Sequence, residues 1–153
     1  MYTLIKFLHI LGAVLFLGNI IVTAMWKARA DRTGDLATIA FAQRLVGLTD
    51  RAFTVPGAAL IAVTGYAMAA RRPFPLHGLP WLEWGQGLFW LTVLLYLIVL
   101  VPIQRRLIAV ADAARRSGSL APEFRRLSAR WALWGGIATL LPLIALYLMV
   151  TKP

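Results

Sequence analysis

Four long stretches without Asp, Glu, Lys or Arg constrain this chain more than any other feature. They cover residues 7–25, 52–70, 84–104 and 131–151. A helix rises about 1.5 Å per residue, so roughly 20 apolar residues cross a hydrocarbon core of about 30 Å. The sequence therefore predicts four membrane-spanning helices.

The composition agrees with this prediction. Of 153 residues, 60% are hydrophobic and 14% are charged, with a mean hydropathy of +0.74, whereas a soluble domain is about a quarter charged. We predict an all-α integral membrane four-helix bundle with cytoplasmic helical extensions, formed by a single domain over residues 1–153. The expected spans are about 3–26, 52–70, 82–103 and 131–150.

The first apolar stretch has one feature of a signal peptide, because Ala28-Arg29-Ala30 behind it imitates a cleavage site. However, the stretch is longer than the apolar region of a signal peptide. Lys27 and Arg29 also follow it as a stop-transfer pattern. We therefore expect it to stay in the protein as the first span.

The net charge of +10 is unevenly distributed. Twelve of the sixteen basic residues lie in the first and third connections: Lys27, Arg29, Arg32, Arg44, Arg51, Arg105, Arg106, Arg115, Arg116, Arg125, Arg126 and Arg130. The positive-inside rule then predicts that these two connections are cytoplasmic and that both termini face outward. We expect these residues to anchor the chain in the lipid bilayer. No nucleic-acid binding is predicted, because the basic clusters lack interleaved aromatic residues.

The pattern also indicates where helices begin and end. The first helix is expected over about residues 3–30, with Gly34 as a stop and Asp35 as the cap of the next helix. Residues 36–50 are amphipathic, and they either lie at the cytoplasmic interface or continue directly into the second span.

Proline, glycine and serine mark the later boundaries. The third helix is expected to pass Pro102 and end at Gly118, and Ser119 is the predicted cap of the fourth helix. Pro56 and Pro142 are expected to bend the second and fourth spans.

Contacts between the helices must come from close approach and polar bonds, since lipid gives the helices no hydrophobic drive toward one another. The small residues expected to permit close approach are Gly57, Gly65, Gly135 and Gly136. Asn19 is expected to hydrogen-bond across helices.

His9 is the most informative polar residue, because it lies in the apolar stretch KFLHILGAVLFLGN. Helical periodicity groups it with Tyr2, Lys6, Ala13, Phe16, Ile20 and Thr23 on a stripe of polar and small residues. We therefore expect His9 to face the bundle interior. An ionisable group inside a membrane is a functional hypothesis by default.

Several roles for His9 remain open: an axial ligand to heme, a ligand to copper, a proton carrier, or a structural hydrogen bond that fixes helix register. For a tetrapyrrole, Lys6 is placed to receive an anionic group of the ligand. Gly12 and Ala13 leave room for a flat body, and Phe16 lies on the same stripe.

For copper(I), imidazole and thioether form a suitable soft ligand set. The candidates are His9, His77 and Met68, which the topology places on one side of the membrane. The chain has no cysteine, which excludes thiolate metal sites, and it has no paired-histidine spacing typical of a metal site.

The helix 1 segment LIKFLHILGAVLFLGNIIVTAMWKARAD, with FTVPGAALIAVTGYAM and LVPIQRRL, resembles a family of small bacterial predicted integral membrane proteins of unknown function. This resemblance covers nearly the whole chain. The KxxHI pattern and the Pro-Gly pair more distantly resemble HemJ-type protoporphyrinogen oxidases and CopD-like copper proteins.

The HemJ resemblance implies that His9 ligates heme b. That family has a GWLHxK-like motif at the start of helix 3, whereas this chain reads PWLEWG over residues 80–85 and lacks the second histidine and the lysine. The resemblance thus supports heme or porphyrin binding and not porphyrinogen oxidation. The CopD resemblance implies periplasmic copper handling by His9, His77 and Met68.

Our leading hypothesis is an inner-membrane heme b or porphyrin protein with an electron-transfer role, ligated through His9. Whether it is a heme-dependent oxidoreductase stays open. The alternatives are a copper-binding or copper-transport component, and a non-catalytic accessory subunit. A second copy of the chain or a membrane redox protein is the expected protein partner.

Overall fold

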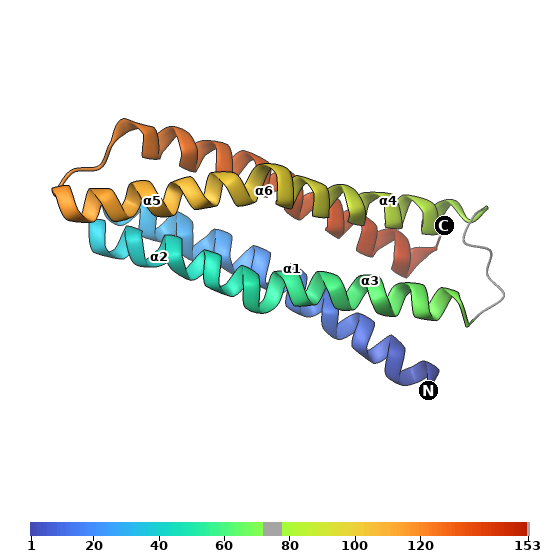
Figure 1. Ribbon diagram of the computed structural model, residues 1–153. Coiled ribbons are helices and arrows are strands. Elements are labelled where there is room, and N and C mark those ends of the chain that lie inside the picture. Colours follow the sequence, from blue (N-terminus) through green and yellow to red (C-terminus); the bar gives the residue numbers. More distant parts are fainter. Residues whose placement is uncertain (72–77, 153) are drawn as a thin grey trace.

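The structure, a computed structural model, describes residues 1–71 and 78–152, and its regular elements in those ranges are all helices (Figure 1). The α-helices are α1 (Tyr2–Thr33), α2 (Leu36–Thr49), α3 (Val55–Ala69), α4 (Pro80–Leu95), α5 (Val101–Ser117) and α6 (Pro122–Thr151). Two π-helical segments, η1 (Asp50–Thr54) and η2 (Tyr96–Leu100), interrupt them. The elements join into four long rods that are each long and apolar enough to cross a membrane, which confirms the predicted four-helix membrane bundle.

The two chain ends lie at one end of the bundle, and the turns after α1 and α5 lie at the other (Figure 1). The basic connections are therefore at the end opposite the termini. Large apolar side chains such as Leu4, Val63, Ile98 and Leu140 are exposed on the outer faces of the rods. Such surfaces suit lipid, since a soluble monomer rarely exposes large apolar patches.

The boundary between the first two rods follows the predicted turn chemistry. Gly34 ends α1 in the left-handed conformation, with φ at 69°. Asp35 then caps α2, because its carboxylate accepts the Thr38 backbone N–H at 2.8 Å. Both predictions for this turn are confirmed.

Residues 36–50 do not form a separate interfacial helix. Instead, α2 continues through η1 into α3 as one rod. In η1 the backbone shifts to the wider π pattern, so the Val55 N–H donates to the Asp50 carbonyl five residues earlier. Pro56 follows directly and has no N–H to donate, which makes a local change in the helical hydrogen bonding necessary.

The third rod, which runs in the opposite direction, also has a π-helical segment before a proline. It runs from α4 through η2 into α5, and the Val101 N–H donates to the Tyr96 carbonyl just before Pro102. Gly118 ends the rod with φ at 76°, as expected. Two antiparallel rods thus each contain a π segment followed by Val-Pro.

The prediction that Ser119 caps the fourth helix is wrong. Helix α6 begins at Pro122, with Ala121 in the N-cap position and no side-chain cap. Proline fits the first helical turn because its N–H would have no intrahelical partner there. Pro142 lies buried within α6, which continues to Thr151.

At the end that carries the termini, α1 packs against α3 and α4 packs against α6. The first pair meets at Gly12 and Gly57: a Cβ atom on Gly57 would lie 2.9 Å from the Phe16 backbone nitrogen. Gly57 therefore permits close approach, as predicted. Gly135 and Gly136 do not have this role, because a Cβ on Gly136 would meet nothing within 4 Å, and one on Gly135 would only touch Trp131.

At the basic end, α2 packs against α5, α1 contacts α2, and α5 contacts α6. Buried apolar side chains from three rods form a core there: Ile39, Ala40, Ile103, Leu107, Ala111, Phe124 and Leu127. This half of the molecule is therefore packed as in a water-soluble helical bundle.

Candidate functional site

His9 faces α3, as the helical stripe predicts. Its Nδ1 atom lies 3.1 Å from the Ile61 carbonyl oxygen and 3.0 Å from the Thr64 hydroxyl. The ring rests on Gly65, where a Cβ atom would come 3.3 Å from the His9 Cε1. Gly65 thus makes space for the imidazole between the two helices.

The partners of Nδ1 favour one tautomer of His9. The Thr64 hydroxyl donates its proton to the Leu60 carbonyl, so toward His9 it can only accept. The Ile61 carbonyl can also only accept. The Ile61 contact therefore favours the tautomer with the proton on Nδ1, in which the lone pair of the neutral ring is on Nε2. For Nε2 the described part of the chain provides no hydrogen bond.

The other predicted cofactor residues lie at different depths of α1. Lys6 is exposed one turn nearer the chain end, and Ala13 is half-buried. Gly12 is buried against α3, where a Cβ atom would lie 3.0 Å from the Gly57 carbonyl oxygen, so its small size serves the helix contact. Phe16 is buried, and its ring centroid lies 6.3 Å from that of Phe89 in α4.

The predicted copper ligands are only partly described. Met68 is half-buried in α3, four residues after the Thr64 that contacts His9. His77 lies outside the described residues. Within the described ranges, no group of three or more His, Cys, Asp or Glu side chains could hold a metal ion. Copper ligation by His9, His77 and Met68 therefore stays a prediction.

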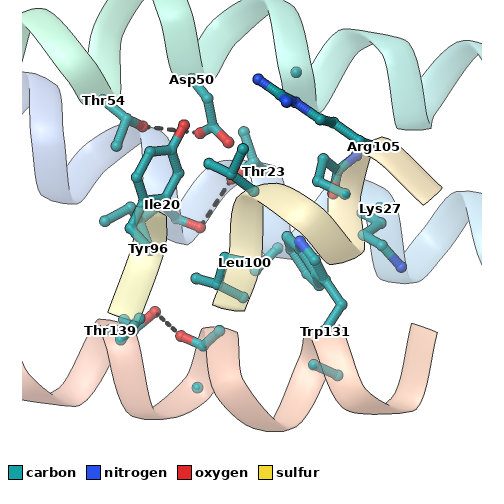
Figure 2. A pocket seen from close by; sticks show the side chains of 18 of the residues that line it. Ile20, Thr23, Lys27, Asp50, Thr54, Tyr96, Leu100, Arg105, Trp131 and Thr139 are labelled. Atoms are coloured by element: carbon teal, nitrogen blue, oxygen red, sulfur yellow. Dashed lines mark hydrogen bonds between the residues drawn. The ribbon is translucent and has the colours of Figure 1, made fainter. Parts of the chain in front are cut away.

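A second site, which the sequence did not indicate, lies nearer the basic end. A cavity of about 460 Å³ opens between all four rods (Figure 2). Its polar lining includes Thr23, Lys27, Asp31, Asp50, Arg51, Thr54, Thr92, Tyr96, Gln104, Arg105, Ser128 and Thr139. Its size falls within the usual range of about 300–1,000 Å³ for small-molecule pockets.

Lys27 lies at one side of this cavity and is only 2% exposed. Its ammonium donates to Asp31 at 2.6 Å and to Ser128 at 2.8 Å, and lies 4.8 Å from the centre of the Trp131 ring. The sequence assigned Lys27 to the first basic connection, as an anchor in the bilayer. It is instead neutralised inside the bundle, where it joins α1 to α6.

The polar network continues from Asp31 into the other rods. The Gln43 amide donates to the second carboxylate oxygen of Asp31 at 3.1 Å. The Gln104 amide in turn donates to the Gln43 backbone carbonyl at 2.9 Å. Lys27, Asp31, Gln43, Gln104 and Ser128 therefore connect all four rods through hydrogen bonds.

Asp50 forms the opposite side of the cavity, at the start of η1. Asn19 donates to its carboxylate at 3.1 Å and to the Thr54 hydroxyl at 2.8 Å, which confirms Asn19 as an interhelical hydrogen-bonder. Thr54 also donates to Asp50, at 2.9 Å. The Tyr96 phenol, which begins η2, is near enough to Asp50 and Arg51 to interact electrostatically with both. The two π segments thus place an acid and a phenol in the same cavity (Figure 2).

This arrangement of four apolar rods around polar sites defines a multi-pass helical membrane protein. A comparison with protein families gives a match over residues 3–153 to the family described as "Predicted integral membrane protein (DUF2269)". The chain belongs to this family, as the resemblance of its helix segments indicated. No curated protein and no solved structure matches it.

Proposed function

We propose that this protein is a heme b or porphyrin binding protein of the bacterial inner membrane, with both termini in the periplasm, and that His9 would be the residue that holds the heme iron. The observation that carries the proposal is the Nδ1–H bond of His9 to the Ile61 carbonyl, at 3.1 Å. Histidines that ligate metals generally donate their other ring N–H to a carbonyl or carboxylate. That bond orients the ring and leaves Nε2 as the ligating atom.

The residues around His9 fit such a ligand in two respects. Lys6 is exposed one turn nearer the chain end, where its ammonium suits a propionate. The exposed apolar side chains of Phe7 and Ile10 border the same stretch of α1. When bound, heme supplies a one-electron redox centre, and the helix pair α1 and α3 sets the orientation of its ligand. This supports a role in electron transfer with a membrane redox partner or a second copy of the chain.

The test is the absorbance spectrum of the full-length protein, purified in detergent with and without added heme. We expect a Soret band that shifts on reduction and disappears in His9→Ala. His77→Ala is the matched control, because it removes the only other histidine, and it should leave the band in place. A colourless protein after heme addition would overturn the proposal.

The proposed orientation can be tested separately. The natural sequence has no cysteine, so single cysteines at positions 34, 118 and 151 can be labelled in intact cells. We expect an impermeant reagent to label only position 151. Labelling of positions 34 and 118 instead would place the basic end in the periplasm and contradict the orientation.

Copper is a second candidate for the same histidine, favoured by the position of Met68. Residues 61, 64, 65 and 68 of α3 follow helical spacing, so Met68 shares the α3 face that contacts His9. Copper(I) titration should then show binding that weakens in Met68→Leu and is retained in Met25→Leu, since Met25 lies in the half of α1 nearer the basic end. Equal binding by both variants would exclude Met68 as a ligand.

A further inference from the structure

The cavity near the basic end contains two kinds of charged group. Lys27 and Asp31 neutralise each other through their 2.6 Å contact. Arg51 and Arg105 also line the cavity, from η1 and α5 respectively. Among the residues that the structure describes, neither guanidinium has an ion-pair or hydrogen-bond partner, and Asp50 has no ion-pair partner. Two cations and one anion therefore remain available to a ligand.

The depth of the cavity indicates where that ligand comes from. Arg51 and Arg105 immediately flank the charge-free stretches 52–70 and 84–104. The cavity is thus at the level where the apolar spans meet the basic end, which is the level of lipid headgroups. Its remaining walls are mostly apolar and include Ile20, Leu97 and Ile108.

We propose that this cavity binds a membrane phospholipid with a phosphoethanolamine headgroup. Arg51 and Arg105 bind the phosphodiester, because guanidinium groups match its oxygens in charge and geometry. The Asp50 carboxylate accepts a hydrogen bond from the ethanolamine ammonium. The apolar wall contacts the first part of an acyl chain. Basic pockets between spans on the cytoplasmic side are a known type of lipid site.

The headgroup follows from the placement of opposite charges. In Figure 2, Asp50, Tyr96 and Arg105 all point into the cavity. A ligand that carried only a phosphate would leave the Asp50 carboxylate facing an anion. A choline headgroup has a cation but no N–H to donate. Asn19 and Thr54 both donate to Oδ1 of Asp50, and ethanolamine supplies the counter-charge and an N–H donor for the other carboxylate oxygen.

The experiment measures lipid binding to the detergent-purified full-length protein by native mass spectrometry. Three phospholipids with identical acyl chains are compared, with ethanolamine, glycerol and choline headgroups. Free phosphoethanolamine is the fourth ligand. We expect one molecule of the ethanolamine lipid to bind most tightly, and free phosphoethanolamine to bind much more weakly because it lacks the chain. Equal binding of the free headgroup would contradict a lipid site.

Variants identify the binding residues. The double substitution Arg51→Gln and Arg105→Gln should weaken binding roughly 100-fold, since each hydrogen bond between charged groups contributes about tenfold. The matched control is Arg115→Gln with Arg116→Gln, which removes two exposed charges outside the cavity and should leave binding unchanged. An equal loss in both pairs would show nonspecific attraction and overturn the site.

Asp50→Asn tests the headgroup separately. The amide keeps the shape of the side chain and an oxygen that accepts from Asn19 and Thr54. We expect the ethanolamine lipid to fall to the affinity of the choline lipid, with phosphate binding preserved. A continued preference for ethanolamine would exclude Asp50 as its acceptor. None of these outcomes depends on a ligand at His9.

Discussion

The two halves of this bundle are held together in different ways. In the half that carries the termini, α1 meets α3 through Gly12 and Gly57, and a few polar groups such as His9 and Thr64 bond across. In the basic half, a network centred on Lys27 and Asp31 joins all four rods through Ser128, Gln43 and Gln104. Lipid favours the first solution, because backbone contact replaces the missing hydrophobic drive. The second solution requires an apolar core packed as in a water-soluble bundle, with the buried charges of Lys27 and Asp31 paired to each other.

The largest expected effect comes from the basic half. Asp31→Ala would leave the Lys27 ammonium, 2% exposed, without its counter-ion. Breaking a buried pair in this way costs about 3–5 kcal/mol. We expect unfolding at much lower denaturant concentration, or failure to assemble, measured by denaturant titration in detergent.

The control is Arg106→Gln, which breaks the Arg106–Glu123 pair, whose side chains are 72% and 47% exposed. Such a surface pair contributes only about 0–1 kcal/mol. If both substitutions had the same small effect, the buried network would not hold the basic half together.

The next effect tests the opposite half. Gly57→Ala places a Cβ atom 2.9–3.1 Å from backbone and side-chain atoms of Gly12 and Phe16, and such overpacking costs about 1–3 kcal/mol. Gly136→Ala is the matched control, because its Cβ would meet nothing within 4 Å. It should be neutral or slightly stabilising. Equal tolerance of both alanines in thermal unfolding would argue against close contact between α1 and α3.

A smaller effect is expected at His9. Thr64→Val removes one acceptor of the Nδ1–H, and interhelical hydrogen bonds in membranes contribute about 0.6 kcal/mol on average. Thr139→Val provides the comparison, since among the described residues Thr139 bonds only to the Gly135 carbonyl of its own helix. The heme spectrum gives a second readout: the Soret band should shift in Thr64→Val alone. An unchanged band would mean that Thr64 does not orient the ligand.

The smallest effect is local, at the turn between the first two rods. The pKa of Asp35 lies below its ordinary value, because the Thr38 hydroxyl and backbone N–H donate to its carboxylate. A depressed pKa means that the cap stabilises the folded state above the unfolded pKa, and this contribution is lost as the pH falls through the folded pKa.

The protection factor of the Thr38 amide, which compares its exchange with the intrinsic rate at the same pH, should therefore fall in acid, and at neutral pH in Asp35→Ala. Asp35→Asn should retain most of the protection, because asparagine also caps helices well. Protection that is independent of pH would show that the cap does not operate.

The sequence predicted the half that carries the termini better than the basic half, for a physical reason. A span is recognised locally, since about 20 apolar residues are needed wherever a helix crosses lipid. The inward direction of His9 and the role of Gly57 follow from helical periodicity. The turn at Gly34 and Asp35 lies at the basic end and was also predicted, because it depends only on neighbouring residues.

The basic half depends on contacts that no local pattern contains. Lys27 has the sequence context of a stop-transfer charge, but its partner Ser128 is 101 residues away. Asp50 meets Asn19 from 31 residues away. One signal was present: an acid at the i+4 position from Lys27 and a threonine at i+4 from Asp50 both indicate groups that lie on one helix face. Ser119 does not cap α6, because the helix begins later, at Pro122. The preference of proline for the first helical turn is the one sequence signal for that start.

The most direct test of the central claim is the tautomer of His9, measured by ¹⁵N NMR on histidine-labelled His77→Ala protein in detergent. The geometry of the Ile61 and Thr64 contacts predicts a protonated Nδ1 and a bare Nε2 without heme, with only the Nε2 resonance shifting strongly when heme is added. A proton on Nε2 would contradict the account, because the ring would then have no lone pair available on the side away from α3.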